Sequence, residues 1–287
     1  MSIIEAVVLG IVQGVTEFLP ISSTGHVTLA GKIMNLISSG NPEKWTSFLA
    51  IVQLGTLLAV LIYFWTDIVS IVKEFLIENL SNRKKISDQS HNSKLGWLII
   101  IGSVPIFTLG LLLKDLIEGP LTKNLYVITG SILLFAVVLA ISEKAASFKK
   151  EMKDITIRDS LLIGIAQVFS LVPGASRSGV TITGGLFTGL RRETAARFSF
   201  LLSIPAVFAS GLFQLYEALS YLDNSMIMSL IIATIFSAIS GYLAIDFLLK
   251  FLRKYSTFIF IYYRFVLGIL ILILLFSNII KPNTVQL

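Results

Sequence analysis

Two short polar stretches stand out in this sequence because they hold side chains that can do chemistry. The first, QGVTEFLPISSTGH at 13–26, contains a carboxylate, several hydroxyls and an imidazole. The second, PGASRSGVT at 173–181, adds an arginine between two serines. Together they supply groups that can attack an electrophile, move a proton and bind an anion. We therefore interpret them as two halves of one site.

The first stretch offers a nucleophile, a base and a metal ligand. Ser23 and His26 are three residues apart, so they share a face on one helical turn and could act as nucleophile and base. Equally, His26 could itself attack phosphorus or protonate a leaving group, and the sequence does not choose. Glu17 could hold a divalent cation together with phosphate oxygens, or it could orient His26. Gln13, one turn before Glu17, could add an amide contact.

The second stretch has the features of a phosphate site. Arg177 stays protonated and presents a planar fork that fits phosphate oxygens. Gly174 and Gly179 permit close backbone approach, and a helix that begins after Pro173 would direct free N–H groups and its positive dipole end at an anion. The candidate phosphate-binding residues from both stretches are Ser22, Thr24, Gly174, Ser176, Ser178 and Thr181.

Each stretch also has a purely structural interpretation. The segment PISSTGH is compatible with a simple helix cap, because serine and threonine are favoured at that position. A lone glutamate–arginine pair in a membrane can likewise be structural. Ionisable groups within a membrane are costly, however, and they indicate function by default. The joint occurrence of Glu17, Ser23, His26 and Arg177 in two similarly broken segments favours a functional site.

The composition indicates a polytopic membrane protein. Of 287 residues, 55% are apolar and 14% are charged, and the mean hydropathy is +0.85, whereas soluble domains carry about 25% charged residues. The absence of cysteine excludes disulfides, and two histidines argue against a multi-histidine zinc site. The net charge of +6 indicates cytoplasmic loops rather than nucleic-acid binding. The N-terminus lacks the basic flank of a signal peptide, so we expect it to be retained.

Six apolar segments are long enough to span about 30 Å of hydrocarbon as helices. They lie near 48–66, 95–113, 125–142, 199–219, 226–249 and 257–280. Proline and small polar residues interrupt two further pairs of shorter segments, which lie near 3–18, 22–37, 157–171 and 178–190. Irregular backbone at membrane depth survives only where protein or water satisfies it. The sequence therefore predicts an all-α integral membrane protein with six transmembrane helices and two re-entrant helix pairs.

The distribution of positive charge predicts the orientation. Sixteen of the 23 Lys and Arg residues lie in the segments 67–94, 143–160, 191–198 and 250–256. Only 5 lie in the segments 1–47, 114–124, 220–225 and 281–287. Because positive charge accumulates in cytoplasmic loops, we expect both termini outside. The first re-entrant pair would then enter from the outside and the second from the cytoplasm, with the site facing the outer leaflet.

The two polar stretches also belong to an internal repeat. Gly10 and Gln13 match Gly164 and Gln167 directly. A one-residue gap then pairs Pro20 with Pro173 and Ser23 with Ser176. The halves 1–142 and 143–287 would enter the membrane from opposite faces, so we expect an inverted-topology repeat within a single membrane domain, 1–287. Such repeats commonly place a site at their interface near the bilayer midplane.

In its motifs the chain resembles the undecaprenyl-diphosphate phosphatases associated with bacitracin resistance. QGVTE fits the (E/Q)xxxE motif of that family, and PGASRSGVT fits its PGxSRSxxT motif. FLPISSTGH looks like the segment that carries the family's active-site serine and histidine. The resemblance covers nearly the whole chain. Gln13 stands where some members have a glutamate, which removes a second potential metal carboxylate.

The resemblance implies hydrolysis of a C55 isoprenyl diphosphate to the monophosphate and inorganic phosphate. This reaction recycles the lipid carrier for peptidoglycan and other wall polymers in the bacterial cell (inner) membrane. The resemblance also implies a divalent cation, Mg²⁺ or Ca²⁺, which we assign to Glu17 with help from Gln13. By resemblance, Ser176, Ser178 and Thr181 support phosphate binding, and the activity is carried by Glu17, Ser23, His26 and Arg177.

Further expectations concern the lipid tail and the alternative function. The isoprenoid tail would lie between spans, where Gly184 and Gly185 could open space. The alternative is an inverted-repeat transporter or flippase of a phosphorylated lipid or anion, which would share the architecture but has no need of a nucleophile. The sequence does not determine the oligomeric state, and a homodimer stays open.

Overall fold

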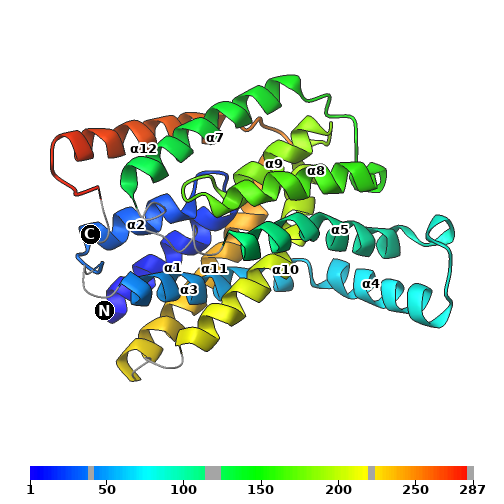
Figure 1. The fold of residues 1–287 in the computed structure, drawn as a ribbon, viewed down its shortest axis with the longest axis horizontal. Helices are drawn as coiled ribbons and strands as arrows, with labels where there is room; N and C mark the ends of the chain where they lie inside the picture. The colour runs from blue at the N-terminus through cyan, green and yellow to red at the C-terminus, as the bar shows by residue number, and fades with distance from the viewer. Residues whose placement is uncertain (38–41, 114–123, 219–223, 283–287) are drawn as a thin grey trace.

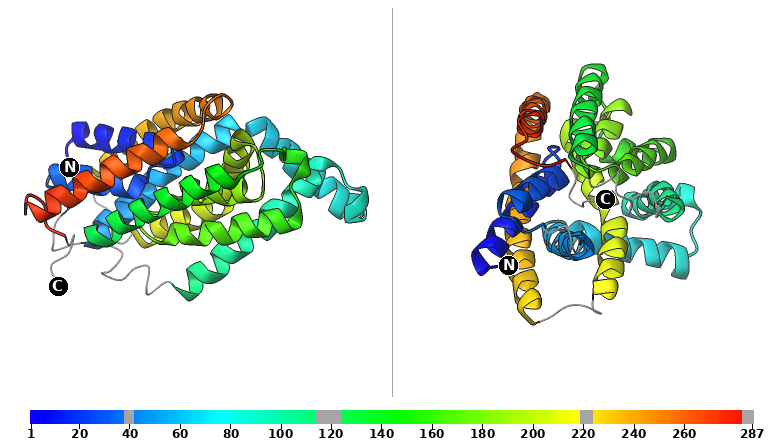
Figure 2. Two further views of the ribbon diagram at one scale, coloured as in Figure 1. Left: turned by 90° about the horizontal axis from the view of Figure 1, so that it is seen from above. Right: turned by 60° about the vertical axis from the view of Figure 1, so that its left-hand side comes forward.

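The computed structural model describes residues 1–37, 42–113, 124–218 and 224–282. Over these ranges the regular structure is helical, and an isolated bridge pairs Lys150 with Leu190. Figures 1 and 2 show a bundle in which helices from the two halves of the chain lie side by side. The predicted all-α class is therefore confirmed.

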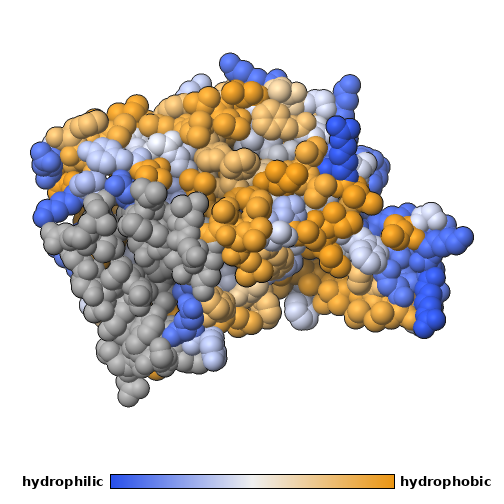
Figure 3. All heavy atoms as spheres, in the orientation of Figure 1, coloured by the Kyte–Doolittle hydropathy of each residue, from blue (hydrophilic) through white to orange (hydrophobic). Residues whose placement is uncertain are grey.

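Among the described residues, five helices are long and apolar enough to cross a membrane. They are α5 (His91–Leu112), α7 (Leu125–Ala145), α10 (Arg192–Ala218), α11 (Asn224–Leu252) and α12 (Phe258–Phe276). A sixth span is counted if α3 (Pro42–Tyr63) and α4 (Trp65–Leu76), which meet at 77°, form one broken span. Figure 3 shows hydrophobic residues over the sides of the bundle. Multi-pass membrane character is confirmed.

The segment 67–94, expected as a loop, is largely helical, so that part of the prediction is wrong. It holds most of α4, a π-helical turn η1 (Ile77–Ser81) and a 3-10 turn η2 (Ile86–Asp88). The chain then folds back onto α5, because Glu74 accepts hydrogen bonds from Ser90 (2.5 Å) and Asn92 (2.8 Å). Charged residues interrupt the apolar run of α4, and they concealed this helix in the sequence. The tip of the α4–α5 hairpin is hydrophilic (Figure 3).

Short helices form the two interrupted pairs. The first pair is α1 (Ile3–Phe18) and α2 (Ser23–Ile33). The second is α8 (Ile157–Val168), which continues into a 3-10 turn η5 (Phe169–Leu171), and α9 (Arg177–Phe187). A further 3-10 turn, η4 (Met152–Asp154), precedes α8. The breaks fall at the two polar stretches, as expected from their prolines and small residues.

A serine with left-handed backbone caps the second helix of each pair. Ser22 has φ 75° and its side chain accepts from the N–H of Gly25 at 3.2 Å. Ser176 has φ 72° and accepts from the N–H of Gly179, also at 3.2 Å. Positive φ is uncommon for residues other than glycine. Its repetition with the same capping bond marks the two serines as equivalent positions.

The one-residue gap expected in the repeat is therefore wrong. Ser22, rather than Ser23, is the counterpart of Ser176. The spacing from Gln13 to Ser22 equals the spacing from Gln167 to Ser176. The two stretches align without a gap, so Arg177 is the sequence counterpart of Ser23. The prolines misled the alignment because they lie at different distances before the cap.

Glycines let the short helices approach the long ones closely. α1 packs along α11, and a Cβ atom at Gly10 would lie 2.4 Å from the carbonyl oxygen of Ala233. Likewise α8 packs along α5, and a Cβ atom at Gly164 would lie 2.1 Å from the carbonyl oxygen of Gly102. Small residues permit such backbone contact between membrane helices. Glycines at matched positions thus allow the first helix of each interrupted pair to pack closely against a long helix.

Gly164→Ala is expected to lower the free energy of unfolding by about 1–3 kcal/mol, because the added methyl group would overlap the backbone at Gly102. Gly130 of α7 is the matched control, since a Cβ atom there meets nothing within 4 Å. Gly130→Ala should be neutral or stabilising by up to about 1 kcal/mol. Thermal unfolding in detergent compares the two variants. Equal stability would show that this contact does not hold α8.

Candidate functional site

The carboxylate of Glu17 is the centre of the site. Glu17 lies in the last turn of α1 and is 6% exposed. Its Oε1 accepts a hydrogen bond from the guanidinium of Arg177. Its Oε2 accepts from Gln13 Nε2 (2.8 Å) and from Ser23 Oγ (2.7 Å). The structure thus brings together predicted site residues from α1, α2 and α9.

The pair of Glu17 and Arg177 joins the two halves of the chain. Their side chains are 5% and 19% exposed, respectively. A carboxylate buried without a partner would be strongly destabilising, and the guanidinium compensates for it. Ser178 strengthens the junction, because its Oγ lies 3.2 Å from the carbonyl oxygens of both Glu17 and Leu19. The carbonyl of Glu17 lies in the last turn of α1, where helical carbonyls have no partner in their own helix, and that of Leu19 also accepts from the N–H of Ile21 at 2.7 Å.

Most of the predicted phosphate-binding hydroxyls are engaged within the protein. Thr181 Oγ1 donates to the carbonyl oxygen of Arg177 (2.7 Å) and contacts the hydroxyl of Ser199. The two cap serines accept from backbone N–H groups of α2 and α9. Thr24 is half-buried in the first turn of α2. These hydroxyls fix the helix N-termini beside Glu17, and the buried ones are Ser22, Ser178 and Thr181.

His26 is held in one tautomer by its neighbours. Its Nδ1 lies 2.7 Å from the carbonyl oxygen of Ser22, which can only accept, so Nδ1 carries the proton. Nε2 of the neutral ring then accepts from the hydroxyl of Tyr263 (2.6 Å), and the two rings stack at 5.5 Å. Tyr263 belongs to α12. The sequence did not indicate it as a site residue, because aromatic residues are common in apolar spans. Nε2 is therefore the reactive nitrogen of His26.

Ser23 and His26 do not pair as expected. The hydroxyl of Ser23, at the first position of α2, donates to the carboxylate at the end of α1. His26 is engaged by Ser22 and Tyr263 instead. Because the interrupted pair brings the end of α1 next to the start of α2, Glu17 is the group positioned to take the Ser23 proton.

Arg264 of α12 holds the break between α8 and α9. This residue is 0% exposed, and its Nε donates to the carbonyl oxygen of Ile132 at 3.1 Å. Its Nη2 donates to the carbonyl oxygens of Ala175 (3.1 Å) and Gly174 (3.3 Å). Gly174 has φ 94°, and a Cβ atom there would lie 2.3 Å from the carbonyl oxygen of Ile128. From the sequence Arg264 was only a charge inside a span, whereas its contacts make it a positioning residue for the PGASR turn.

A cavity of about 500 Å³ adjoins the second stretch. Arg177 and Gln167 are among the residues that line it, and its walls are mainly apolar residues of α5 and α10. Gln167 is 0% exposed, and neither of its amide atoms has a hydrogen-bond partner among the described residues. Buried polar groups without a partner are uncommon in proteins. As the repeat counterpart of Gln13, Gln167 is a further candidate site residue.

Glu17 and Gln13 are the residues that fit a divalent cation. Across the described ranges, no group of three or more His, Cys, Asp or Glu side chains is arranged to hold a metal by itself. Magnesium, however, is commonly bound by one or two carboxylates together with substrate phosphates and water. Gln13 lies beside the carboxylate, and exchanging its amide N and O by rotation would present an oxygen ligand. This donor set fits a metal that enters with a phosphorylated ligand.

Arg264→Lys is expected to lower the free energy of unfolding by about 2–4 kcal/mol, because an ammonium group cannot reach three carbonyls in the geometry of the guanidinium fork. Arg253→Lys is the control, since that guanidinium forms an exposed ion pair with Glu193, and this change should leave stability unaltered. Thermal unfolding and hydrogen exchange of 173–177 measure the effect. If the amides of 173–177 exchanged as slowly in Arg264→Lys as in the wild type, Arg264 would not be a positioning residue for this turn.

Comparison with known proteins places these features in a family. The family described as bacitracin resistance protein BacA matches residues 6–270. An undecaprenyl-diphosphatase of Syntrophobacter fumaroxidans is 55% identical over 97% of this chain and 99% of that protein. Undecaprenyl-diphosphatases of Chlorobium phaeovibrioides and Chlorobaculum parvum are 47% and 45% identical, each over 98% of this chain and 100% of the relative. The chain therefore belongs to the BacA family of bacitracin resistance proteins.

Proposed function

We propose that this protein is an integral membrane phosphatase that hydrolyses undecaprenyl diphosphate to undecaprenyl phosphate and inorganic phosphate. Family membership and relatives described as undecaprenyl-diphosphatases support the substrate and the reaction. The reaction recycles the lipid carrier for bacterial cell-wall synthesis, and through it the protein confers bacitracin resistance. The observation that carries the proposal is the convergence of Ser23 and Arg177 on one buried carboxylate, Glu17.

Two helix N-termini and Arg177 are suited to bind the terminal phosphate. α2 and α9 both begin beside Glu17, so the N–H groups of their first turns and their positive dipole ends lie close together. When a diphosphate enters, Arg177 exchanges part of its contact with Glu17 for phosphate oxygens. Preorganised donors of this kind stabilise charge on the transferred phosphoryl group, which is the main task in phosphoryl transfer.

Ser23 is the nucleophile that this arrangement favours. Glu17 accepts the hydroxyl proton as Ser23 Oγ forms a bond to the terminal phosphorus. The bridging P–O bond breaks, and undecaprenyl phosphate leaves with the bonding electrons. Water then attacks the phosphoserine, which releases inorganic phosphate and regenerates the hydroxyl. His26, with Nε2 oriented by Tyr263, accepts the proton of the attacking water.

A divalent cation, Mg²⁺ or Ca²⁺, completes the proposed site. Glu17 and Gln13 would hold it together with the diphosphate. When bound, the cation neutralises negative charge on the phosphate oxygens.

The proposed membrane arrangement has six transmembrane helices and two re-entrant pairs in an inverted repeat of 1–142 and 143–287. The matched cap serines support it, as does the meeting of both helix breaks at Glu17. The excess of Lys and Arg in the four segments assigned to the cytoplasm supports termini on the outside. The site then opens toward the outer leaflet of the bacterial inner membrane.

Purified protein in detergent is expected to release phosphate from undecaprenyl diphosphate in the presence of Mg²⁺. Ser23→Ala and Arg177→Ala should each lower kcat/KM by about 10³-fold, because they remove the nucleophile and the main phosphate donor. Arg191→Ala, which breaks an exposed pair with Glu151, is the control and should retain activity. No release by folded wild-type protein would refute the phosphatase and favour lipid transport.

An acid-stable phosphoserine is expected on quenching, whereas an acid-labile adduct lost in His26→Ala would assign His26 as nucleophile.

Gln13→Glu is expected to lower the Mg²⁺ concentration that gives half-maximal activity by about tenfold, because a second carboxylate adds charge to the cation site. Gln89→Glu is the matched control, since Gln89 is bonded to Asn79 in the α4–α5 hairpin. Its metal dependence should equal that of the wild type. An unchanged requirement in Gln13→Glu would show that Gln13 does not bind the cation.

A further inference from the structure

An apolar groove follows the seam between α5 and α10. Three cavities lie along it, of about 500, 310 and 220 Å³. The first and second share Phe107 as a lining residue, and the second and third share Ile100 and Pro205. Because neighbouring cavities share lining side chains, they lie in a row along the two helices.

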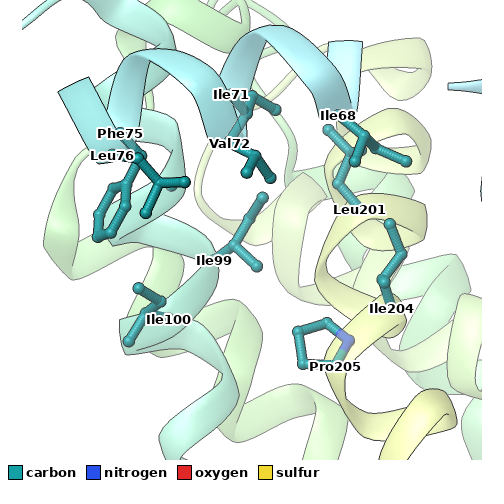
Figure 4. A pocket seen from close by; sticks show the side chains of 11 residues that line it. Ile68, Ile71, Val72, Phe75, Leu76, Ile99, Ile100, Leu201, Ile204 and Pro205 are labelled. Carbon is teal, nitrogen blue, oxygen red and sulfur yellow. The ribbon is translucent and has the colours of Figure 1, made fainter. Parts of the chain in front are cut away.

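The two ends of this α5–α10 groove differ in chemistry. The first cavity reaches the candidate active site, since it is lined by Arg177 and by the unpartnered amide of Gln167. The last cavity is lined by apolar side chains alone and ends against α4 at Phe75 and Leu76, as Figure 4 shows. Polar groups are therefore concentrated at the end that adjoins the phosphate-binding arginine.

Proline explains why the seam is open. α5 contains Pro105 and α10 contains Pro205, each inside the helix. A proline within a helix removes one backbone hydrogen bond and kinks the axis, so two helices with central prolines cannot pack side by side along their whole length. Exposed side chains such as Val104 and Phe107 border the gap.

The expectation that Gly184 and Gly185 open space for the tail is wrong. A Cβ atom at Gly184 would lie 2.9 Å from the Cβ of Ala166, and one at Gly185 would lie 2.7 Å from the Cβ of Ala195. Both glycines are buried, and they serve close helix packing. They leave no room for a lipid chain.

We propose that the α5–α10 groove binds the polyisoprenyl chain of the substrate, with the diphosphate at Arg177 and the chain directed toward α4. This inference rests on the proposed function and specifies how that site recognises its lipid. Continuity with Arg177 identifies the occupant as the substrate's own tail rather than a bulk lipid. The α5 residues that line the three cavities run from Gly96 to Leu111, which is about 23 Å along the helix axis, so the groove favours long chains over short ones.

The test compares a valine-to-tryptophan substitution in the groove with the same substitution outside it. Val104 of α5 lines the middle cavity and is 54% exposed, and Val266 of α12 is 66% exposed and lines none of the three cavities. Val104→Trp should raise KM for the C55 diphosphate about tenfold, because the indole displaces buried tail surface. Hydrolysis of a C15 isoprenyl diphosphate, whose chain occupies less of the groove, should be slowed much less. Val266→Trp should affect neither substrate.

If Val104→Trp slowed hydrolysis of the C55 and C15 diphosphates equally, or slowed neither, the proposal that the groove binds the tail would be overturned. A second readout needs no turnover: a photoreactive C55 monophosphate should crosslink to α5 and α10 in the wild type. Val104→Trp should remove the crosslinks to Ile100 and Phe75. Equal crosslinking by a tagged phospholipid would overturn the proposal by identifying bulk lipid as the occupant. Crosslinking without hydrolysis would refute the phosphatase while retaining the groove.

Discussion

A buried ion pair between two interrupted helices is the constraint on which this structure depends. Glu17 ends one short helix and Arg177 begins another, and neither charge is tolerable in an apolar interior without the other. The two breaks must therefore meet. Their meeting places the first turns of α2 and α9 beside one carboxylate. The same contact thus brings a hydroxyl, an amide and a guanidinium together at Glu17.

The short helices require cover that only long helices can provide. α1 is covered by α11 and α8 by α5, so each half of the chain shields the interrupted pair of the other half. Matched glycines bring the backbones into contact at both places. The first helix of each interrupted pair is therefore packed against the other half of the chain. This packing accounts for the interleaving of early and late helices in Figure 1.

Local signals in the sequence were sufficient to locate the helix breaks and the residues around Glu17. Proline, clustered serines and the loss of apolar character all act within a few residues, and the predicted start and end of α1 agree with the structure. Features set by tertiary contact could not be predicted. Tyr263 reaches His26 from α12, far along the chain, and it lies in an apolar span whose one charged residue is Arg264. The left-handed caps also went unseen, because serine has no intrinsic preference for positive φ.

The ungapped register of the repeat shows how a symmetric scaffold divides its chemistry. The counterpart of Ser23 is Arg177, the counterpart of Glu17 is Leu171, and the counterpart of His26 is Val180. One half therefore carries the carboxylate, the hydroxyl and the imidazole, and the other carries the guanidinium.

The matched glutamines show the consequence of this division. Gln13 donates to Glu17. Leu171, four residues after Gln167, offers no acceptor in its side chain, and the amide of Gln167 lacks a partner among the described residues. The loss of one carboxylate from the second half thus leaves a polar group buried at the wall of the cavity that contains Arg177. Because leucine stands at this position, the second half adds no negative charge beside Arg177 at the wall of this cavity.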